Sequence, residues 1–295
     1  MNKIIIIAGP TATGKTEFAI KLAKNFNGEL INTDSRQIYK FADIGTNKGD
    51  IKYVNNQHFI EDVLIHLVNF KYPNQKYSAF EFQQDAFKIT KNLVKKNKLP
   101  IFVGGTGLYV SSIIDNSYYP KVTSKNTIYR QKLEKLSKLD LQNLAKSKNP
   151  AEFENMNYSD KNNKRRLIRI IEKSEETENQ TSKNPFCIFN KEIYYPKIGL
   201  DIKNIEVRIA KRVKEMLQSG WIDETKYLLS KGYSALDLSN CGIGYTIIND
   251  YLQEKIKYDE LLNTIIIKHR QYAIKQIRWY KKYLLDKFNV NLFTN

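Results

Sequence analysis

The sequence contains 295 residues, with 48 Lys and Arg against 31 Asp and Glu, so its formal net charge is +17. Hydrophobic residues make up 41%, which excludes a disordered chain and is enough to build a core. The apolar run at residues 4–8 is far shorter than the ~20 residues of a membrane span, and no small-residue cleavage site of a signal peptide follows it. The two cysteines, Cys187 and Cys241, exclude a disulfide scaffold or a cysteine-rich zinc site. We therefore expect a cytoplasmic protein without membrane association.

The positive charge is clustered. Residues 121–173 contain 14 Lys and Arg against 6 Asp and Glu, a net charge of +8. Compositional drift toward Lys, Asn, Ile and Tyr explains scattered lysines but predicts no cluster. Because basic side chains neutralise phosphates and release counterions, the cluster favours a nucleic-acid-binding region.

The first part of the chain alternates strands, glycine-rich turns and helices. Residues 4–8 predict a strand buried on both faces, followed by a turn and an amphipathic helix. We expect further strands at residues 29–33, around 59–67 and at 100–103, and a helix at residues 79–96. This order predicts an α/β fold with a doubly wound parallel sheet.

The pattern changes after about residue 115. Residues 121–173 are helical in pattern, with Leu133, Leu136, Leu139, Leu141 and Leu144 as the expected core face. Strand character returns at residues 186–200, and helices are expected at 205–218 and 261–285. We predict a catalytic core of residues 1–115 and 196–295, including C-terminal helices, and a helical basic insertion at 116–195. Since no heptad run demands a dimer, we expect a monomer.

One segment matches the Walker A pattern at every required position: Gly9-Pro10-Thr11-Ala12-Thr13-Gly14-Lys15-Thr16. Its glycines let backbone N–H groups turn around a phosphate, and the following helix directs its positive end there. Lys15 supplies a mobile positive charge, and the Thr16 hydroxyl is a candidate ligand of Mg²⁺. With this segment, the predicted parallel sheet is of the P-loop NTPase-like kind. The segment predicts a polyphosphate site of the type found in ATP-binding and other nucleotide-binding proteins, with Mg²⁺ as cofactor.

A carboxylate stands at an unusual place for an ATPase. Such enzymes usually hold Mg²⁺ with an aspartate that ends a later strand, whereas the strand at residues 100–103 ends in Gly104-Gly105. Here the strand after the loop ends at Asp34 instead. Because the carboxyl ends of parallel strands line the ligand crevice, Asp34 and Thr106 should face Lys15. Asp34 is a candidate metal ligand or proton acceptor, or alternatively a cap of the following turn.

With the phosphate loop, two further segments resemble the tRNA dimethylallyltransferase family, the tRNA isopentenyltransferases of the bacterial type. They are Asp34-Ser35-Arg36-Gln37-Ile38-Tyr39, followed by Asp43-Ile44-Gly45-Thr46-Asn47-Lys48, and Val103-Gly104-Gly105-Thr106-Gly107-Leu108-Tyr109. The resemblance continues in Gly242-Ile243-Gly244-Tyr245 and in residues 270–279, so it spans almost the whole chain.

The resemblance implies transfer of the dimethylallyl group from dimethylallyl diphosphate to N6 of the adenine at position 37 of tRNA, beside the anticodon, with release of diphosphate. The phosphate loop then holds diphosphate rather than ATP. Asp34 is the expected general base, and Lys15, Thr11 and Mg²⁺ at Thr16 stabilise the departing charge. Arg208 matches a family arginine that reaches the same phosphates; without the resemblance it reads as part of a solvated helix face.

The same resemblance implies contacts with the tRNA anticodon stem-loop. Its expected tRNA-binding residues are Asp34, Ser35, Arg36, Gln37, Thr106, Lys164, Arg165, Arg166 and Arg169. The family pattern Asn-Asp-Pro-Gln-Arg reads Asn162-Asn163-Lys164-Arg165-Arg166 here, so Arg166 and Arg169 keep the pattern while no base-specific role carries over to Asn163 or Arg165. His269 stands where a Thr is common and is assigned no role, and Tyr272 and Trp279 fit a packing stripe.

Three alternatives remain open. A prenyltransferase with a free adenine nucleotide as acceptor shares the loop and Asp34 but needs no basic insertion. A P-loop kinase uses Asp34 to deprotonate a hydroxyl and consumes ATP. A non-enzymatic RNA-binding protein does not require Lys15, Thr16, Asp34 and Arg208 to be intact together.

Overall fold

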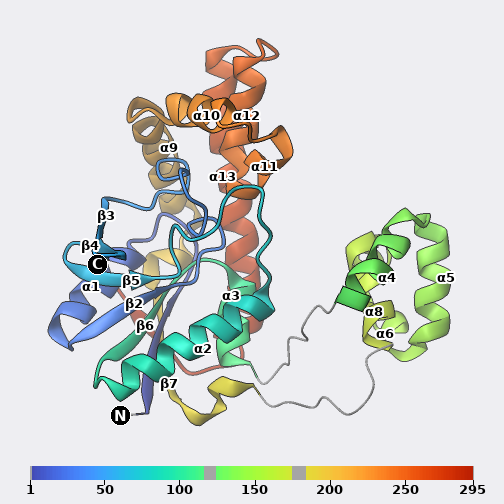
Figure 1. The fold of residues 1–295 in the computed structure, drawn as a ribbon, viewed down its shortest axis with the longest axis horizontal. Coiled ribbons are helices and arrows are strands. Elements are labelled where there is room, and N and C mark those ends of the chain that lie inside the picture. Colours follow the sequence, from blue (N-terminus) through green and yellow to red (C-terminus); the bar gives the residue numbers. More distant parts are fainter. Residues whose placement is uncertain (1, 116–123, 175–183, 295) are drawn as a thin grey trace. The chain divides into compact units, whose positions relative to one another are not determined.

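The computed structural model describes residues 2–115, 124–174 and 184–294. They form two compact units: a larger one from residues 2–115 and 184–294, and a smaller one from residues 124–174 (Figure 1). The sequence predicted an insertion that ends at residue 195. Residues 184–195 instead belong to the larger unit, because Asn190–Pro196 forms a strand of its sheet.

The described part of the larger unit contains an eight-stranded sheet in the order β3-β4-β5-β2-β6-β1-β7-β8. In this spatial order, the last six strands (β5, β2, β6, β1, β7 and β8) pair in parallel, whereas β3, β4 and β5 form an antiparallel meander. The strands are β1 (Lys3–Ala8), β2 (Gly28–Asn32), β3 (Ile51–Val54), β4 (Gln57–Ile60), β5 (Val63–His66), β6 (Leu99–Gly104), β7 (Asn190–Pro196) and β8 (Val290–Phe293). The α/β fold class predicted from the sequence is confirmed.

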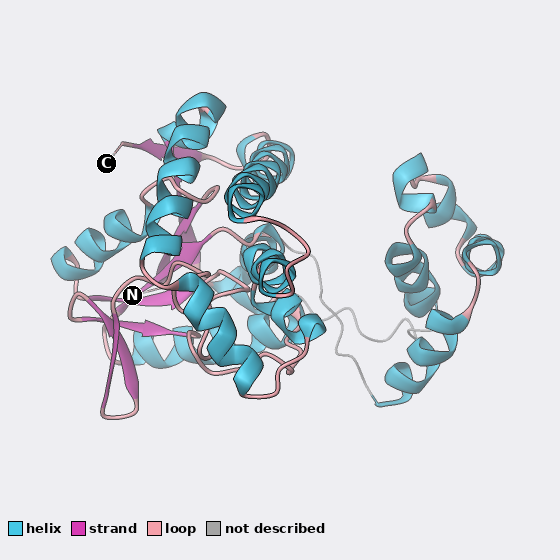
Figure 2. Ribbon diagram, turned by 90° about the horizontal axis from the view of Figure 1, so that it is seen from above, coloured by secondary structure: helices cyan, strands magenta, loops and turns pink. Residues whose placement is uncertain are grey.

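The uninterrupted apolar run of β1 follows from its place inside the sheet. Ile4 and Ile6 pack into the core on one face, and Ile5 and Ile7 pack into the core on the other. Helix α1 (Lys15–Asn25) covers the second face, and α2 (Ala79–Lys95) and α3 (Gly107–Ile114) cover the first. Figure 2 shows helices on both sides of the strands. A parallel strand covered on both sides has no solvent face, so its sequence does not alternate.

The predicted strand at residues 59–67 is divided between β4 and β5. Asn55 and Asn56 form the two-residue turn between β3 and β4, and Glu61 and Asp62 form the turn between β4 and β5; all four have positive φ. Positive φ at both central residues is the condition for a type I′ hairpin, which asparagine and aspartate tolerate. The meander thus extends the parallel sheet at one edge.

The C-terminal part of the larger unit is helical and continues into a short π-helix before β8 (Figure 1). Its helices are α9 (Ile202–Gln218), α10 (Trp221–Ser230), α11 (Ala235–Cys241), α12 (Ile243–Leu252), α13 (Tyr258–Tyr280) and the π-helix η3 (Lys281–Leu285). Short 3₁₀ turns, η1 (Pro185–Ile188) and η2 (Lys197–Leu200), flank β7. The buried faces of α9–α13 share one core with Ala12, Ile38 and Ala42, so this helical layer packs directly on the loops at the carboxyl ends of β1 and β2.

The smaller unit consists of helices. They are α4 (Ser124–Lys135), α5 (Lys138–Lys148), α6 (Pro150–Glu154), α7 (Tyr158–Lys161) and α8 (Lys164–Ser174). Leu133 and Leu141 are buried and Leu136 and Leu144 pack against the same core, as predicted. The prediction for Leu139 was wrong, since its side chain is 65% exposed. Leu133 lies in α4, Leu136 lies in the turn after it, and the other three lie in α5, whose start Ser137 caps, so one continuous face does not run through all five.

Across the described ranges of the chain, no helix combines the length and the apolar character that crossing a membrane requires.

Candidate active site

The phosphate loop connects β1 to α1. Gly14 lies directly before the helix with φ 80° and ψ 9°, a left-handed conformation that glycine adopts without strain. The Thr13 hydroxyl donates a hydrogen bond of 2.9 Å to the Pro10 carbonyl and closes the loop on itself. The N-terminal N–H groups and the dipole of α1 therefore face the same side as the loop, which favours an anion there.

A pocket of about 170 Å³ lies over this loop. Residues 11–16 line it from the loop and α1, Asp34 and Gln37 from the segment after β2, and Gly104 and Gly105 from the end of β6. Further lining comes from more distant parts of the chain, namely Thr46, Asn47, Lys48, Ile60, Ile65, Arg212 and Gln276. The expected meeting of Asp34 with Lys15 at one edge of the sheet is therefore present in the structure.

Lys15 is buried in this pocket. Its ammonium donates hydrogen bonds to the Pro10 carbonyl at 2.5 Å and to Thr13 Oγ1 at 3.4 Å. Burial, and next the charge of Arg212, lower the pKa of Lys15 to about 7, although Asp34 acts in the opposite direction. Two cations in a desolvated pocket favour an anionic ligand, because the ligand replaces their mutual repulsion by attraction.

Asp34 combines the two roles considered for it. Its Oδ1 accepts the Arg36 backbone N–H at 2.8 Å, which is the turn-capping interaction of an Asx turn. Asn32 fixes the same residue from the other side, accepting the Asp34 N–H at 2.9 Å and donating to the Asp34 carbonyl at 3.0 Å. The second carboxylate oxygen makes no hydrogen bond to the described residues. Capping therefore orients the carboxylate and leaves one oxygen for chemistry in the pocket.

Thr106 ties the ends of β2 and β6 together. Its Oγ1 accepts the Ser35 N–H at 2.9 Å and donates to Ser35 Oγ at 3.1 Å, and its N–H donates to the Thr33 carbonyl at 3.1 Å. Next to it, Gly107 lies against the indole of Trp279, where a Cβ would overlap the ring. Thr106 thus lies next to Asp34, and Trp279 packs in the core as the sequence predicted.

Gln276 of α13 bridges the two glycine-rich turns. Its Oε1 accepts the Thr11 N–H at 3.0 Å, and its Nε2 donates to the Gly105 carbonyl at 2.8 Å. The side chain is 6% exposed, so both bonds are shielded from water. Gln276 therefore fixes the spacing between the phosphate loop and the end of β6, a role that its residue type and place in the sequence do not predict.

Arg212, rather than Arg208, lines the pocket. Its Nη1 donates a hydrogen bond of 3.0 Å to Thr11 Oγ1, whereas Arg208, one turn earlier on α9, is exposed and does not line the pocket among the described residues. Burial lowers the pKa of Arg212, and Arg208 adds to this effect. The phosphate role predicted for Arg208 stays a prediction, and Arg212 is the arginine with the direct contact.

Two further predicted residues of the larger unit, Arg36 and Gln37, follow Asp34 in the chain, and Gln37 lines the pocket. The Arg36 guanidinium reaches the C-terminus of α11, where it donates to the Asn240 carbonyl at 2.5 Å. Gln37 donates from Nε2 to the carbonyls of Thr46 and Asn47 at 3.3 and 3.1 Å. His269 is assigned no role by the sequence; burial lowers its pKa to about 4, so it is neutral at physiological pH.

The pocket offers hard oxygen atoms to a metal ion. The Thr16 hydroxyl lies at the start of α1 and makes no hydrogen bond to another described residue, and the Asp34 carboxylate lines the same pocket. The described residues contain no group of three or more His, Cys, Asp and Glu side chains that could hold a metal. This donor set fits Mg²⁺, which usually takes one or two protein oxygens together with phosphate oxygens and water.

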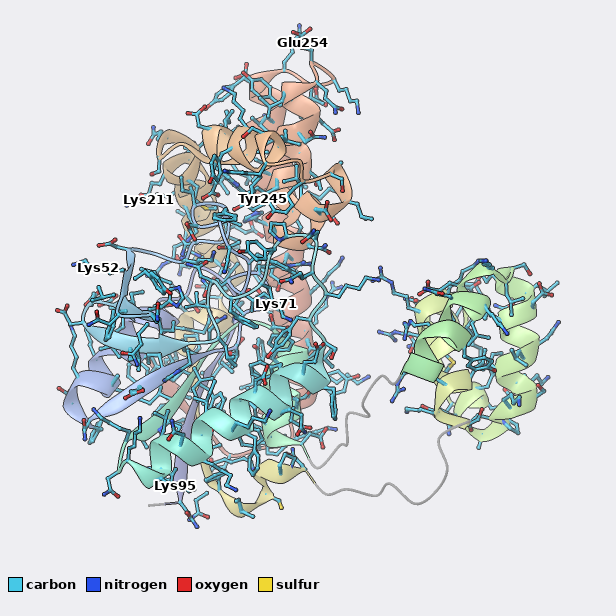
Figure 3. All side chains as sticks on the ribbon, viewed as in Figure 1. Lys52, Lys71, Lys95, Lys211, Tyr245 and Glu254 are labelled. Carbon is cyan, nitrogen blue, oxygen red and sulfur yellow. The ribbon has the colours of Figure 1, made fainter. Side chains whose placement is uncertain are left out.

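Basic residues of the smaller unit lie at the start of α8. Lys164, Arg165 and Arg166 are exposed there, although cations at a helix N-terminus oppose the helix dipole. Arg166 is paired with Asp160, and Lys164 donates to the Leu136 carbonyl at 2.6 Å, whereas Arg165 makes no ion pair within the described residues. Arg169 Nη1 lies 3.8 Å from Glu172 Oε2. Lysines of the larger unit are exposed as well, for example Lys52, Lys95 and Lys211 (Figure 3).

The sheet order, the phosphate loop after β1 and the cations Lys15 and Arg212 in the pocket over it define an α/β protein of the P-loop class. The profile of the IPP transferase family matches residues 37–283, and the isopentenyl transferase profile matches residues 2–58. The chain belongs to the IPP transferase family.

Its relatives are similar over nearly their whole length. The tRNA dimethylallyltransferase of Endomicrobium trichonymphae is 35% identical, over 94% of this chain and 91% of the relative. That of Clostridioides difficile (strain 630) is 34% identical over 100% and 94%, respectively. The crystal structure of the tRNA isopentenylpyrophosphate transferase of Bacillus halodurans, 30% identical, matches 100% of this chain and 90% of that chain with a TM-score of 0.67. A eukaryotic dimethylallyltransferase acting on tRNA, 26% identical, matches 100% and 74% with a TM-score of 0.78.

Proposed function

We propose that the protein transfers the dimethylallyl group from dimethylallyl diphosphate to N6 of the adenine at position 37 of tRNA, 3′ of the anticodon, and releases diphosphate. The observation that carries this proposal is the pairing, in one pocket, of a phosphate loop with a carboxylate at the end of β2 rather than β6. The relatives named tRNA dimethylallyltransferase support it over nearly the full length of the chain.

In this reaction a bond forms between N6 of the adenine and the terminal allylic carbon, and the bond from that carbon to the diphosphate oxygen breaks. The electron pair of the broken bond leaves with diphosphate, and the N6 proton passes to the uncapped oxygen of Asp34. Lys15, Arg212 and the N–H groups at the start of α1 stabilise the charge on the departing diphosphate. Mg²⁺, when bound at Thr16 with the diphosphate, supplies further neutralisation of that charge.

The acceptor base has to leave its stack to reach a pocket of this kind. Gln37 and Thr106 lie beside Asp34 and are the proposed contacts to the extruded nucleotide, together with Ser35 and Arg36. The exposed cations Lys164, Arg165 and Arg166 of α8, together with the half-buried Arg169, are the proposed contacts to the phosphates of the anticodon stem. We propose that the protein acts as a monomer in the cytoplasm, where its tRNA substrate occurs.

The decisive experiment is incubation with dimethylallyl diphosphate, Mg²⁺ and unmodified tRNA, followed by nucleoside mass analysis. One dimethylallyl group added to adenosine is the expected product. The same assay with free adenosine monophosphate in place of tRNA separates this acceptor from the nucleotide acceptor of the first alternative. Consumption of ATP with phosphorylation of a substrate, and no prenyl transfer, would contradict the proposal in favour of a kinase.

A further inference from the structure

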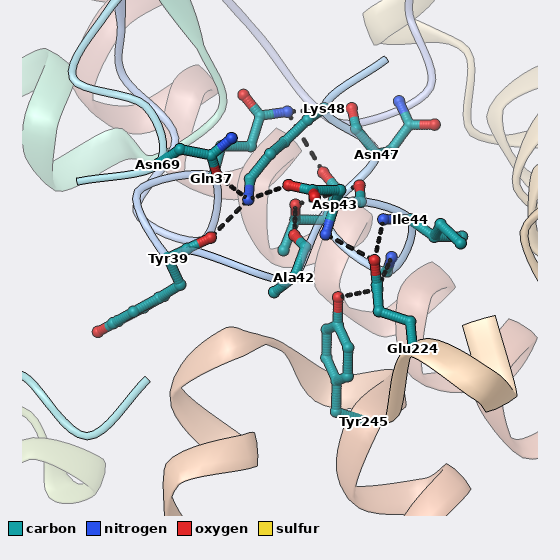
Figure 4. A network of polar contacts seen from close by, with 12 residues as sticks. Gln37, Tyr39, Ala42, Asp43, Ile44, Asn47, Lys48, Asn69, Glu224 and Tyr245 are labelled. Carbon is teal, nitrogen blue, oxygen red and sulfur yellow. Dashed lines mark hydrogen bonds and ion pairs between the residues drawn. The ribbon is translucent and has the colours of Figure 1, made fainter. Parts of the chain in front are cut away.

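Residues 43–48, here named the Asp43 loop, direct three consecutive backbone N–H groups at one carboxylate. Glu224 Oε2 accepts from the N–H groups of Asp43 and Ile44 at 2.8 and 2.7 Å, and Oε1 accepts from Gly45 at 3.0 Å. The Tyr245 hydroxyl donates to the same Oε1 at 2.6 Å (Figure 4). A single carboxylate from α10 thus collects four hydrogen bonds, three of them from a loop that is about 180 residues away in sequence.

The packing around this carboxylate requires glycine at two positions. A Cβ at Gly45 would overlap the indole of Trp221 and the ring of Tyr245, and a Cβ at Gly244 would overlap the same indole. Trp221 itself is fully buried. Two sequence motifs that the reaction chemistry does not use therefore pack around the same two side chains, Glu224 and Trp221. They are Asp43-Ile44-Gly45 and Gly242-Ile243-Gly244-Tyr245.

The other end of the Asp43 loop is held by a buried cation. Lys48 is 3% exposed, and its ammonium donates to the Tyr39 carbonyl, to Asn69 Oδ1 and, at 2.8 Å, to Asp43 Oδ1 (Figure 4). Burial lowers the pKa of Lys48, and the charge of Asp43 opposes this shift. An ammonium has three donors, and all three are used, so Lys48 braces the loop although it lines the pocket.

The position of this loop determines a wall of the active-site pocket. Its residues Thr46, Asn47 and Lys48 line the pocket together with Lys15 and Asp34. The carbonyls of Thr46 and Asn47 accept the two hydrogen bonds from the Gln37 amide. Glu224 therefore acts on the pocket through the loop and Gln37.

We propose that Glu224 is a positioning residue for the acceptor side of the reaction. By binding the Asp43 loop, its carboxylate holds Gln37 where the acceptor nucleotide is recognised, while the phosphate loop is fixed separately by Gln276. The identity of the acceptor rests on the proposed function, whereas the structural link from Glu224 to the loop does not.

Amide hydrogen exchange in the free protein tests the structural link. Glu224→Ala should accelerate exchange across residues 43–45 by on the order of tenfold or more, because three charge-assisted hydrogen bonds are lost. Glu224→Gln, which keeps one acceptor oxygen, and Tyr245→Phe, which removes one donor, should give smaller increases. Asp223→Ala is the matched control, since the neighbouring Asp223 is 79% exposed and pairs only with Lys226 in the described part of the chain. Unchanged exchange in Glu224→Ala overturns the proposal.

Steady-state kinetics test the consequence. Glu224→Ala should raise KM for tRNA by on the order of tenfold, as expected for the loss of positioned polar contacts, and should change the affinity for dimethylallyl diphosphate less than threefold. Glu224→Gln should recover part of the difference. Equal losses for both substrates indicate general unfolding of the pocket and overturn the acceptor-side assignment. If the wild-type protein does not modify tRNA, the proposed function fails, and the exchange result still decides the role of Glu224 in the loop.

Discussion

Two groups of basic side chains, one in each compact unit of this protein, differ in their exposure to solvent. In the pocket of the larger unit, Lys15 is buried and Arg212 is half-buried. Desolvation lowers the pKa of both, and each donates a hydrogen bond to the phosphate loop, Lys15 to the Pro10 carbonyl and Arg212 to Thr11 Oγ1. At the start of α8 in the smaller unit, Lys164, Arg165 and Arg166 are exposed. Desolvated charges recognise one ligand with defined geometry, whereas solvated charges supply attraction that salt weakens. The first arrangement suits a reacting diphosphate and the second suits a nucleic-acid backbone.

The largest effect should come from the carboxylate that distinguishes the pocket. Asp34→Ala should lower turnover by ~10²–10⁴-fold, the usual contribution of a general base, while tRNA binding is largely kept. Single-turnover prenylation and filter binding of tRNA measure the two quantities. Asp34→Asn keeps the cap on the Arg36 N–H and is the matched control for loop geometry. Undiminished turnover in Asp34→Asn would remove Asp34 as the base.

The two arginines of α9 offer a comparison within the pocket itself. Arg212→Ala should lower kcat/KM for dimethylallyl diphosphate by roughly 10–100-fold, because a half-buried charge with a direct contact to Thr11 is lost. Arg208→Ala should have a smaller effect, since Arg208 is exposed and acts on the site through its charge. The reverse order of effects would restore Arg208 as the phosphate ligand and make Arg212 a support of the loop.

The buried lysine should make diphosphate binding depend on pH. With a pKa of about 7, Lys15 is mostly protonated at pH 6 and mostly neutral at pH 8. The affinity for dimethylallyl diphosphate should therefore fall by about tenfold between these values, as the cation is lost with rising pH. In Lys15→Arg the guanidinium stays charged, so the decrease should largely disappear in titration calorimetry. Parallel pH profiles for the two proteins would show that the ligand, not Lys15, is titrating.

The smallest effects should come from the exposed cations of the smaller unit. Arg165→Ala should weaken tRNA binding a few-fold and reduce the salt slope by about one phosphate contact. Arg166→Ala should do less, because Asp160 already neutralises part of its charge. Lys95→Ala, an exposed lysine at the end of α2, is the charge-matched control outside α8. If Lys95→Ala reduces the salt slope as much as Arg165→Ala does, tRNA is held by the general positive charge of the protein and not by an interface on α8.

The sequence predicts the parts of the site that are local in the chain. The phosphate loop, Asp34 and Thr106 follow strands whose apolar runs are easily recognised, and the rule for parallel strands places their ends together. Gln276 could not be assigned in the same way, because its partner Thr11 is 265 residues away and glutamine on a helix has no distinctive spacing. Its place in the motif at residues 270–279 was the available signal. Arg212 was missed for a similar reason, since burial and not residue type separates it from Arg208.

In the fold too, the elements with a clear local sequence pattern were predicted, and those that depend on distant contacts were not. The strands β1, β2 and β6 and the helix α2 were predicted closely, whereas β3, β8 and the helices between residues 221 and 252 were not. The strands β3 and β8 are four residues long and largely exposed, so they lack the apolar pattern that burial imposes. The helices α10–α12 are ten residues or shorter, and their positions depend on packing around Trp221 and Tyr245. Such elements are fixed by tertiary contacts rather than by local propensity.

The pairing of β1 has a consequence for the order of folding during synthesis. β1 lies between β6 and β7, and its residue Lys3 pairs opposite Asn190, beyond the whole smaller unit in sequence. The smaller unit builds its core from residues less than 50 positions apart, so we expect it to fold on the ribosome while β1 still lacks one neighbour. Arg212 and Gln276 emerge later still. The phosphate loop is thus synthesised before the strand β7 and the side chains Arg212 and Gln276 that complete its geometry.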